Sequence, residues 1–189
     1  MFILASKSPR RKLLMQEIVP AFSIEEAKID EEKYRKDTPI ETVKNIALHK
    51  ALAVFKNHPE DIVISADTIV VLNNKIYGKP KSEKEAHDIL RSLSGKSHNV
   101  ITAYCIACKK DIITNYVTTK VTFNTLSDDL IYRYIKSGSP MDKAGAYGIQ
   151  DNDKFHIIKN IEGSYQNVVG FPVFEIKDIL SKIDDSDKR

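Results

Sequence analysis

The run from Asp61 to Leu72 constrains the fold of this 189-residue chain more than any other stretch. Residues 62–72 are apolar nearly throughout, in the order Ile-Val-Ile-Ser-Ala-Asp-Thr-Ile-Val-Val-Leu. A continuous apolar run of this kind is typical of a central strand that is covered on both faces. Asp67 lies in its middle, and an ionised carboxylate there is costly unless a partner or a metal satisfies it. The run therefore predicts an α/β fold with a candidate functional carboxylate in its sheet.

Helical and strand patterns extend this prediction along the chain. Helices are expected over 8–18, 39–55, 83–93, 127–136 and 172–183, where apolar residues recur at helical spacing or capping residues are present. Short strands are expected over 2–5, 20–24, 76–78 and 155–159. The segments 99–107 and 112–123 flank Lys109-Lys110-Asp111, which predicts a long hairpin. A hairpin added to the buried strand makes the sheet mixed.

A basic helix start follows the N-terminal strand. Ser8 can cap this helix with its hydroxyl, and Pro9 suits the first helical position, where a missing N–H costs nothing. Arg10 and Arg11 fall in the first turn, where cations oppose the helix dipole by roughly 0.3 to 1 kcal/mol each. A polyphosphate would compensate them, because it accepts backbone N–H groups and pairs with guanidinium groups in the same small volume. Solvated arginines on a basic surface turn are the alternative.

Composition limits the class of protein. Hydrophobic residues at 42% and charged residues at 29% are ordinary globular values, which argues against wholesale disorder. A net charge of +3 without a long lysine and arginine run gives no support for stable nucleic-acid binding. No apolar stretch approaches the roughly 20 residues of a membrane span, and the N-terminus has the reverse order of a signal peptide. A cytoplasmic protein without a membrane partner is expected.

The two cysteines form a Cys-x-x-Cys pair at Cys105 and Cys108, which is compatible with redox chemistry or with half of a zinc site. Residues 100–108 have the pattern of a strand, however, and an offset of three places the two sulfurs on opposite faces. The sequence contains no second Cys/His pair at ligand spacing. Ordinary thiols in the core or on the surface are therefore expected.

Three segments, 6–11, 65–79 and 140–150, carry polar residues of the kinds that are found in site loops. They offer arginines and lysines for phosphate groups, and a threonine and a glutamine for hydrogen bonds to a base. Asp67 and the acidic segment 25–32 offer carboxylates for a divalent cation. Together the segments point to a phosphorylated ligand.

Several motifs resemble those of one known family. They are Leu4-Ala5-Ser6-x-Ser8-Pro9-Arg10-Arg11, Ala66-Asp67-Thr68, Gly78-Lys79-Pro80, Leu93-Ser94-Gly95-x-x-His98 and Asp142-Lys143-Ala144-Gly145-Ala146-Tyr147-Gly148-Ile149-Gln150. In this order they resemble the Maf family of nucleoside triphosphate pyrophosphatases, from residue 1 to about residue 183. The resemblance implies hydrolysis between the α and β phosphates, which gives a monophosphate and pyrophosphate with Mg²⁺ or Mn²⁺ as cofactor.

The resemblance also implies roles for individual residues. The branch that acts on dTTP, UTP and modified uridine triphosphates has Arg, Thr and Gln at the positions that match Arg10, Thr68 and Gln150. The proton-accepting carboxylate of the family matches Asp67, and Glu31 matches a further polar position of the family's site. Glu31 could complete a site for a hard cation with Asp67, because Mg²⁺ usually takes only one or two carboxylates. The remaining candidates for substrate binding are Ser8, Arg11, Lys50, Lys79 and Lys143.

The chemistry of these residue types agrees with the implied reaction. Attack by water on a phosphorus needs neutralised phosphate charge, a placed water and a base for its proton, and Asp67 is the candidate base. The Gln150 amide can both donate and accept, which fits two adjacent positions on the pairing edge of uracil or thymine. The alternative is a nucleic-acid-binding or division-regulating protein without hydrolase activity. Asp67 and Glu31 argue against it, because carboxylates repel a nucleic-acid backbone.

The resemblance implies a Maf/ITPase-like α/β fold. An elongated, bent, mixed sheet flanked by helices is expected, with two lobes around a central cleft. A single domain of two lobes would cover residues 1–183, and residues 184–189 would form a frayed tail. A nucleoside triphosphate is the expected partner, and a homodimer is implied by the resemblance only.

Overall fold

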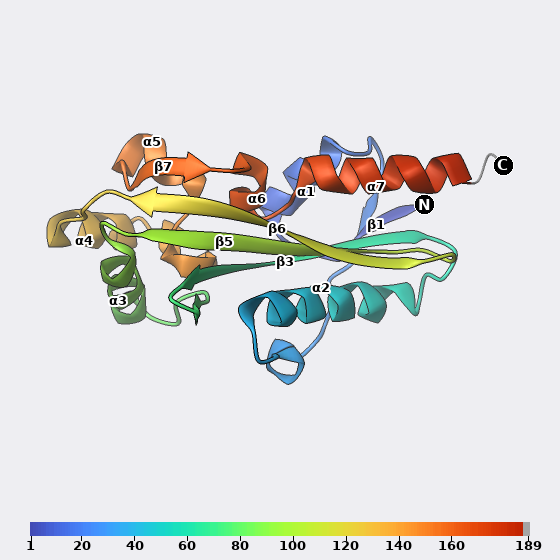
Figure 1. Ribbon diagram of the computed structural model, residues 1–189, viewed down its shortest axis with the longest axis horizontal. Coiled ribbons are helices and arrows are strands. Elements are labelled where there is room, and N and C mark those ends of the chain that lie inside the picture. Colours follow the sequence, from blue (N-terminus) through green and yellow to red (C-terminus); the bar gives the residue numbers. More distant parts are fainter. Residues whose placement is uncertain (187–189) are drawn as a thin grey trace. The chain divides into compact units, whose positions relative to one another are not determined.

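The computed structural model describes residues 1–186, with side chains up to Ile183 (Figure 1). Its strands are β1 (Phe2–Leu4), β2 (Ser23–Ile24), β3 (Ile62–Leu72), β4 (Lys75–Tyr77), β5 (Ser97–Ala107), β6 (Ile112–Phe123) and β7 (Ile158–Glu162). Its α-helices are α1 (Pro9–Gln16), α2 (Pro39–Phe55), α3 (Glu83–Leu93), α4 (Asp128–Lys136), α5 (Asn152–Phe155), α6 (Tyr165–Val169) and α7 (Val173–Ser186). Short 3-10 turns cover Glu31–Tyr34, Ser139–Asp142, Ala144–Ala146 and Ile149–Asp151.

One mixed sheet contains all the strands of the described residues. The strand order is β2-β1-β3-β5-β6-β7, and β4 pairs with β3. β1 runs parallel to β2 and to β3, whereas the β3–β4 and β6–β7 pairs are antiparallel. Reciprocal backbone hydrogen bonds between Cys108 and Asp111 close the turn of the β5–β6 hairpin. The expected α/β fold with a mixed sheet is confirmed.

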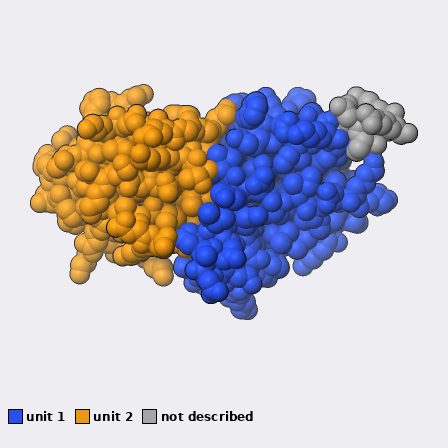
Figure 2. Space-filling view, in the orientation of Figure 1, with its two compact units in different colours: residues 1–67, 102–117, 170–189 blue, residues 68–101, 118–169 orange. Residues whose placement is uncertain are grey.

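The chain divides into two compact units (Figure 2). Unit 1 comprises residues 1–67, residues 102–117 and the C-terminal segment from Gly170. In its core, α2 packs on β1, β3 and β5 through small and branched side chains, which are Ile3, Ala5, Ala51, Val54, Val63, Cys105 and Ala107. Thr38 caps α2 by accepting a hydrogen bond from the Glu41 N–H, and Pro39 occupies its first turn.

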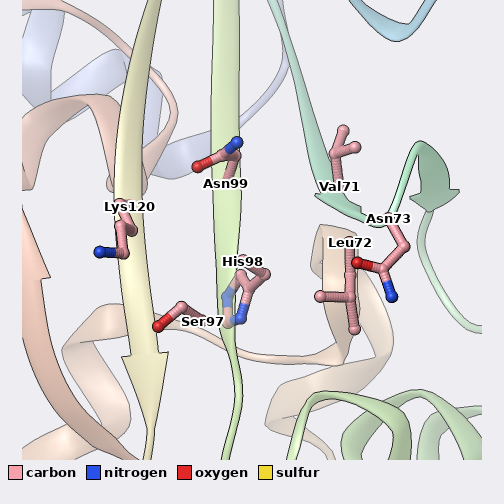
Figure 3. Close-up of a pocket in the computed structure, with 7 residues that line it drawn as sticks. All are labelled: Val71, Leu72, Asn73, Ser97, His98, Asn99 and Lys120. Atoms are coloured by element: carbon pink, nitrogen blue, oxygen red, sulfur yellow. The ribbon is translucent and has the colours of Figure 1, made fainter.

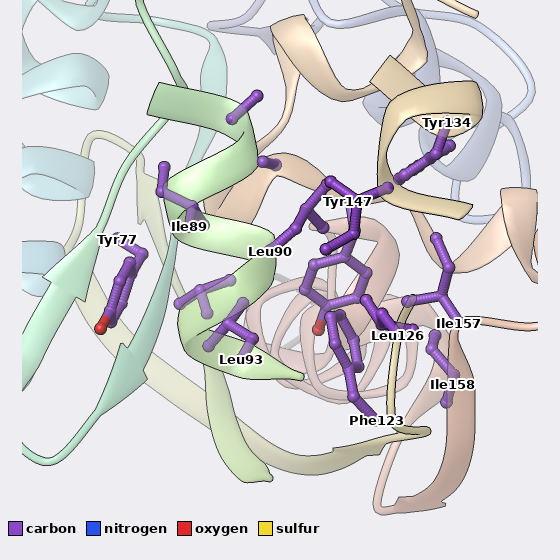
Figure 4. Packing of buried hydrophobic residues seen from close by; sticks show 14 of the residues in the cluster. Tyr77, Ile89, Leu90, Leu93, Phe123, Leu126, Tyr134, Tyr147, Ile157 and Ile158 are labelled. Carbon is purple, nitrogen blue, oxygen red and sulfur yellow. The ribbon is translucent and has the colours of Figure 1, made fainter. Parts of the chain in front are cut away.

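Unit 2 comprises residues 68–101 and 118–169. Its core includes the apolar stripe of α3, formed by Ala86, Ile89, Leu90 and Leu93, and the buried residues of α4, which are Ile131, Tyr134 and Ile135 (Figure 4). Ser82 and Ser127 cap these two helices with their hydroxyls. The stripe that the sequence predicts for 83–93 is thus the face that α3 buries.

An aromatic cluster lies in this core. The His98 ring makes edge contacts with Phe123 and Tyr147, at centroid distances of 4.8 and 5.4 Å. His98 Nε2 and the Tyr147 hydroxyl are 2.8 Å apart and hydrogen-bonded. His98 is only 3% exposed, and its Nδ1 has no hydrogen-bond partner among the described residues. The cluster joins β5 and β6 to the loop that contains Tyr147.

The buried His98 predicts a loss of stability in mild acid. Burial lowers the pKa of His98 from 6.5 to about 4, so the folded state resists a proton that the unfolded state accepts. The contribution of the neutral His98 to the free energy of unfolding is fully present above pH 6.5 and decreases as the pH drops toward 4. At about 1.36 kcal/mol per pKa unit, the loss is on the order of 3 kcal/mol near pH 4.

Urea unfolding of the wild type and of His98→Gln at pH 7 and pH 4.5 measures this effect. Between the two pH values, the free energy of unfolding of the wild type is expected to fall by about 2 kcal/mol more than that of the variant. Equal losses in the two proteins would show that His98 takes up its proton as readily in the folded state as in the unfolded state.

Most element boundaries agree with the sequence prediction, and the helices at 39–55 and 83–93 agree to the residue. The strand expected over 155–159 is wrong in its position, because α5 continues to Phe155 and β7 begins at Ile158. His156 ends α5 in the left-handed region at φ 51°, and the Asn152 side chain accepts the Ile158 N–H at 2.6 Å. Because of these two features, β7 begins at Ile158 rather than at Phe155.

The C-terminal helix also extends beyond its expected end at 183, since α7 continues to Ser186. Of the frayed tail that the sequence predicts over 184–189, residues 187–189 lie outside the described part of the chain.

Two further sequence expectations concern membranes and thiols. Among residues 1–186, none of the helices combines the length and the hydropathy that crossing a bilayer requires. Cys105 and Cys108 are free thiols in buried positions. Burial raises the pKa of the Cys105 thiol to about 11, which disfavours the reactive thiolate. Both thiols therefore lie in the core, which is one of the two locations that the sequence predicts.

Candidate active site

The register of β1 on β3 places the basic helix start beside Asp67. Leu4 pairs with Ile64, and the Ala5 N–H donates to the Ile64 carbonyl at 2.8 Å. Because the two strands are parallel, the segment after Ala5 runs alongside the part of β3 that leads to Asp67. Asp67 is buried, with 8% of its surface exposed.

The start of α1 has the expected cap. The Ser8 hydroxyl accepts a hydrogen bond from the Arg11 N–H at 3.5 Å, and Pro9 occupies the first turn. The Ser6 hydroxyl in turn accepts the Ser8 N–H at 3.2 Å. These hydrogen bonds hold the backbone of the first turn of α1, from which the Arg10 and Arg11 side chains extend.

Arg11 extends from this turn toward several polar groups of unit 1. Its Nε donates to the Gly170 carbonyl at 2.9 Å, and its Nη1 donates to the Ser6 hydroxyl at 3.4 Å. Burial lowers the pKa of Arg11, whereas the Asp67 and Glu31 carboxylates act in the opposite direction. Arg11 therefore lies close enough to both carboxylates for electrostatic interaction. Arg10 lies beside it and further lowers the pKa of Arg11.

The Lys50 ammonium lies between two carboxylates. It is 2.7 Å from Asp67 Oδ1 and 2.7 Å from Glu31 Oε1. The side chains of Lys50 and Asp67 are only 13% and 11% exposed, whereas Glu31 is 51% exposed. The pair with Asp67 offsets the cost of burying a carboxylate inside an apolar strand.

One face of α2 holds the segment that carries Glu31. The Thr42 hydroxyl accepts the Lys36 N–H at 2.9 Å and donates to the Lys36 carbonyl at 3.0 Å. The Asn45 amide donates to the Tyr34 carbonyl at 2.8 Å. The Tyr34 ring stacks on His49 with a centroid distance of 3.8 Å. These contacts, at helical spacing along α2, keep Glu31 over Lys50.

The two carboxylates that contact Lys50 are ligands of the kind that a hard cation such as Mg²⁺ prefers. Glu31 and Asp67 direct carboxylate oxygens at one ammonium group, which shows that both can contact the same positive charge. Mg²⁺ usually takes one or two carboxylates and completes its shell with water and phosphate oxygens. Among the described residues, no group of three or more His, Cys, Asp or Glu side chains forms a metal-binding cluster. The two carboxylates therefore fit a cation that is held jointly with a phosphate ligand.

Unit 2 carries the other candidate residues. Thr68 follows Asp67 in β3 and is partly buried. Lys79 is exposed and comes two residues after Tyr77, the last residue of β4. Tyr77 pairs with Val70 in an antiparallel register, so the chain leaves β4 toward the end of β3 that contains Thr68.

Lys143 and Gln150 belong to the irregular loop after α4. The Lys143 ammonium donates to the Ser139 carbonyl at 2.5 Å and to the Asp142 carboxylate at 2.7 Å. Gln150 is exposed, in the 3-10 turn Ile149–Asp151. The loop therefore holds Lys143 close to its own backbone and leaves the Gln150 amide accessible.

Unit 2 contains a cavity of about 210 Å³ (Figure 3). It is lined by Val71, Leu72, Asn73, Ser97, His98, Asn99 and Lys120. None of the residues that the sequence singles out for binding or catalysis lines it.

The structure adds residues that the sequence prediction missed. Ser6 supports Arg11 and lies within the Ser6-x-Ser8 motif, so its spacing was a usable signal. The Gly170 carbonyl, which accepts from Arg11, is 159 residues away along the chain and leaves no local signal. Arg11, Glu31, Lys50 and Asp67 lie together in unit 1, where Ser8 caps the helix that carries Arg11. The other candidates, Thr68, Lys79, Lys143 and Gln150, belong to unit 2.

The fold has a counterpart among solved structures. The structure of the Staphylococcus aureus Ham1 protein matches 96% of this chain and 98% of that chain, with a TM-score of 0.57. The sequence identity is 12%, so this likeness concerns the fold alone. It supports the expected α/β fold class.

Similar sequences cover nearly the whole chain. A protein of Clostridioides difficile (strain 630) named dTTP/UTP pyrophosphatase is 43% identical over 182 residues, or 95% of this chain and 93% of that protein. A Pyrococcus furiosus protein of the same name is 45% identical over 174 residues, or 92% and 90%. A family model described as Maf-like protein matches residues 1–183. These matches show that the chain belongs to the Maf family.

Proposed function

We propose that the chain hydrolyses dTTP, UTP and modified uridine triphosphates to the monophosphate and pyrophosphate. The observation that carries the proposal is the cluster in unit 1, where Lys50 bridges Glu31 and Asp67 at 2.7 Å and Arg11 interacts with both carboxylates. Two related proteins named dTTP/UTP pyrophosphatase, at 43% and 45% identity, support the choice of substrate.

The proposed reaction is a displacement at the α-phosphorus. A water oxygen forms a bond to this phosphorus, the bond to the oxygen that bridges the α and β phosphates breaks, and pyrophosphate leaves with the bonding electrons. Asp67 accepts the proton of the water as general base. Arg11 and Lys50 neutralise phosphate charge, and Ser8 adds a neutral hydrogen-bonding group at the helix start. Arg10, Lys79 and Lys143 are further proposed substrate-binding residues.

Glu31 and Asp67 are the residues that would hold Mg²⁺ or Mn²⁺. The bound cation would supply Lewis-acid stabilisation of phosphate charge. This assignment is supported by the contact of both carboxylates with the same ammonium group, that of Lys50.

Recognition of the base is assigned to Gln150 and Thr68. The exposed Gln150 amide can donate to one oxygen of a pyrimidine and accept from its ring N–H. A site that pairs these groups rejects other bases, because the wrong base leaves polar atoms unpaired. Thr68, which follows Asp67 directly, would contact the base or the sugar.

Location and assembly complete the proposal. Nucleoside triphosphates are metabolites of the cytoplasm, so we place the enzyme there. The homodimer that the family resemblance implies is a prediction that sedimentation of the pure protein tests. A stable complex with nucleic acid is not expected, because Glu31 and Asp67 would repel phosphate in the absence of a cation.

Incubation of the pure protein with Mg²⁺ and a panel of triphosphates tests the proposed function. The panel consists of dTTP, UTP, dCTP, dATP and GTP, and pyrophosphate is separated from orthophosphate. We expect pyrophosphate as product and fastest release from dTTP and UTP. Release of orthophosphate, or tight DNA binding without any hydrolysis, would reject the proposal in favour of another activity.

The role of Gln150 leads to a specificity prediction. In Gln150→Glu the side chain has only acceptors, so it can no longer donate to a pyrimidine oxygen. We expect kcat/KM for UTP and dTTP to fall about 10- to 100-fold, with a smaller effect on ATP and GTP. Steady-state kinetics on all four nucleotides measures the ratio. An equal loss for every base would mean that Gln150 contacts no base edge.

A further inference from the structure

A chain of hydrogen bonds holds the loop from Ser139 to Asp151 in unit 2. Asp151 Oδ2 accepts from the Tyr134 hydroxyl at 2.6 Å and from the Ser139 hydroxyl at 2.8 Å. The Tyr134 hydroxyl accepts the Gly148 N–H at 3.0 Å. The Ser139 hydroxyl accepts from the Lys143 ammonium at 3.0 Å. We call these five residues the loop network.

The donors and acceptors of the loop network form one consistent series. Each of the two hydroxyls accepts one hydrogen bond and donates another, and both branches end on the Asp151 carboxylate. Hydrogen bonds to an ionised acceptor are roughly twice as strong as neutral ones. Burial and the neighbouring Asp151 raise the pKa of Tyr134, so its hydroxyl stays protonated and continues to donate.

Close packing reinforces these hydrogen bonds. A Cβ atom at Gly148 would lie 2.6 Å from Lys143 Cε and 3.0 Å from Asp151 Oδ2. The side chains of Lys143 and Asp151 therefore pack directly against the Gly148 backbone. Tyr134 itself is 0% exposed and is fixed by the hydrophobic cluster of unit 2, where Figure 4 shows its ring.

From these contacts we infer that Asp151 and Tyr134 are positioning residues that fix Gln150 and Lys143 for nucleotide recognition and thereby set pyrimidine selectivity. Asp151 follows Gln150 directly, so its two hydrogen bonds fix the backbone from which Gln150 extends. The branch through Ser139 fixes the ammonium of Lys143. The inference rests on the proposed function, because it concerns the same nucleotide.

Substitutions in the loop network separate positioning from chemistry. In Tyr134→Phe and Asp151→Ala we expect KM for dTTP to rise about tenfold or more, with kcat changed less than about threefold. Selectivity for dTTP over dCTP and dATP should fall in both variants. Asp151→Asn keeps an acceptor oxygen, so it should restore most of the selectivity. Tyr132→Phe is the matched control, because Tyr132 is 60% exposed on the same helix and should behave as wild type.

Hydrogen exchange on the same variants gives a measurement that does not depend on activity. Amides in 139–151 should exchange faster in Tyr134→Phe and Asp151→Ala than in the wild type, while those of α3 keep their protection. Faster exchange together with lost selectivity supports the inference. Unchanged KM and selectivity in both folded variants would overturn it, and so would a loss confined to kcat.

The two proposals fail in different ways. A wild-type protein that hydrolyses no triphosphate overturns the proposed function, and the recognition role of Asp151 and Tyr134 falls with it. A wild type that is active on dTTP, with variants that retain its KM and selectivity, leaves the proposed function intact and overturns the positioning role alone.

Discussion

Asp67→Asn is expected to lower turnover at least roughly 100-fold while nucleotide binding is largely retained. The asparagine side chain has nearly the same shape but cannot take the proton of the attacking water. It still offers an oxygen to the Lys50 ammonium, which lies 2.7 Å from the Asp67 carboxylate. The charges that we assign to phosphate binding, on Arg11 and Lys50, remain in place.

Single-turnover kinetics with dTTP and equilibrium binding of the nucleotide separate these two effects. Glu60→Gln is a suitable control, because Glu60 is an exposed carboxylate that pairs with Lys109 at 2.8 Å on the surface of the molecule. The control should turn over at the wild-type rate. Near-normal turnover in Asp67→Asn would remove Asp67 from the mechanism.

Gly145→Ala is expected to destabilise the protein by about 2 to 4 kcal/mol. Gly145 has φ 70°, a conformation that is costly for alanine. An added Cβ would also lie 2.7 Å from Val70 Cγ2 and 2.9 Å from Val70 Cβ in β3. The Gly145 N–H donates to the Gly78 carbonyl at 3.0 Å, so the loop cannot move away without losing this hydrogen bond.

Gly138→Ala separates strain from steric overlap. Gly138 has nearly the same φ, 75°, but a Cβ at this position would meet no atom within 4 Å. This control should lose only about 1 kcal/mol, the cost of the backbone conformation. Urea unfolding of both variants gives the two values. Equal losses would mean that Val70 yields to the new methyl group and that overlap contributes nothing.

Local signals predicted the regular parts of the fold. The helices α2 and α3 have a proline or serine start signal and a clear apolar stripe, and their bounds agree with the sequence. The buried strand β3 was visible as a continuous apolar run. The predicted start of β7 is wrong, because the start depends on the left-handed conformation of His156 and on the hydrogen bond that the Ile158 N–H donates to the Asn152 side chain.

The candidate site was predictable where its residues belong to compact motifs. Ser8 and Arg11 are close in sequence, and the helix cap that joins them follows from residue type. The ion pair between Lys50 and Asp67 spans 17 residues and was not predicted, because the resemblance implies a role for each residue but no contact between them. The partners that support the loop, such as Tyr134 for Gly148, are set by packing between elements, which the sequence pattern does not contain.

Hydrolysis of dTTP in ¹⁸O-labelled water tests the central claim, which is that water attacks the α-phosphorus beside Asp67. After one turnover, mass spectrometry locates the label in the products. The account predicts one labelled oxygen in the nucleoside monophosphate and none in pyrophosphate. Label in pyrophosphate, or in released orthophosphate, would place the attack on another phosphorus and contradict the account.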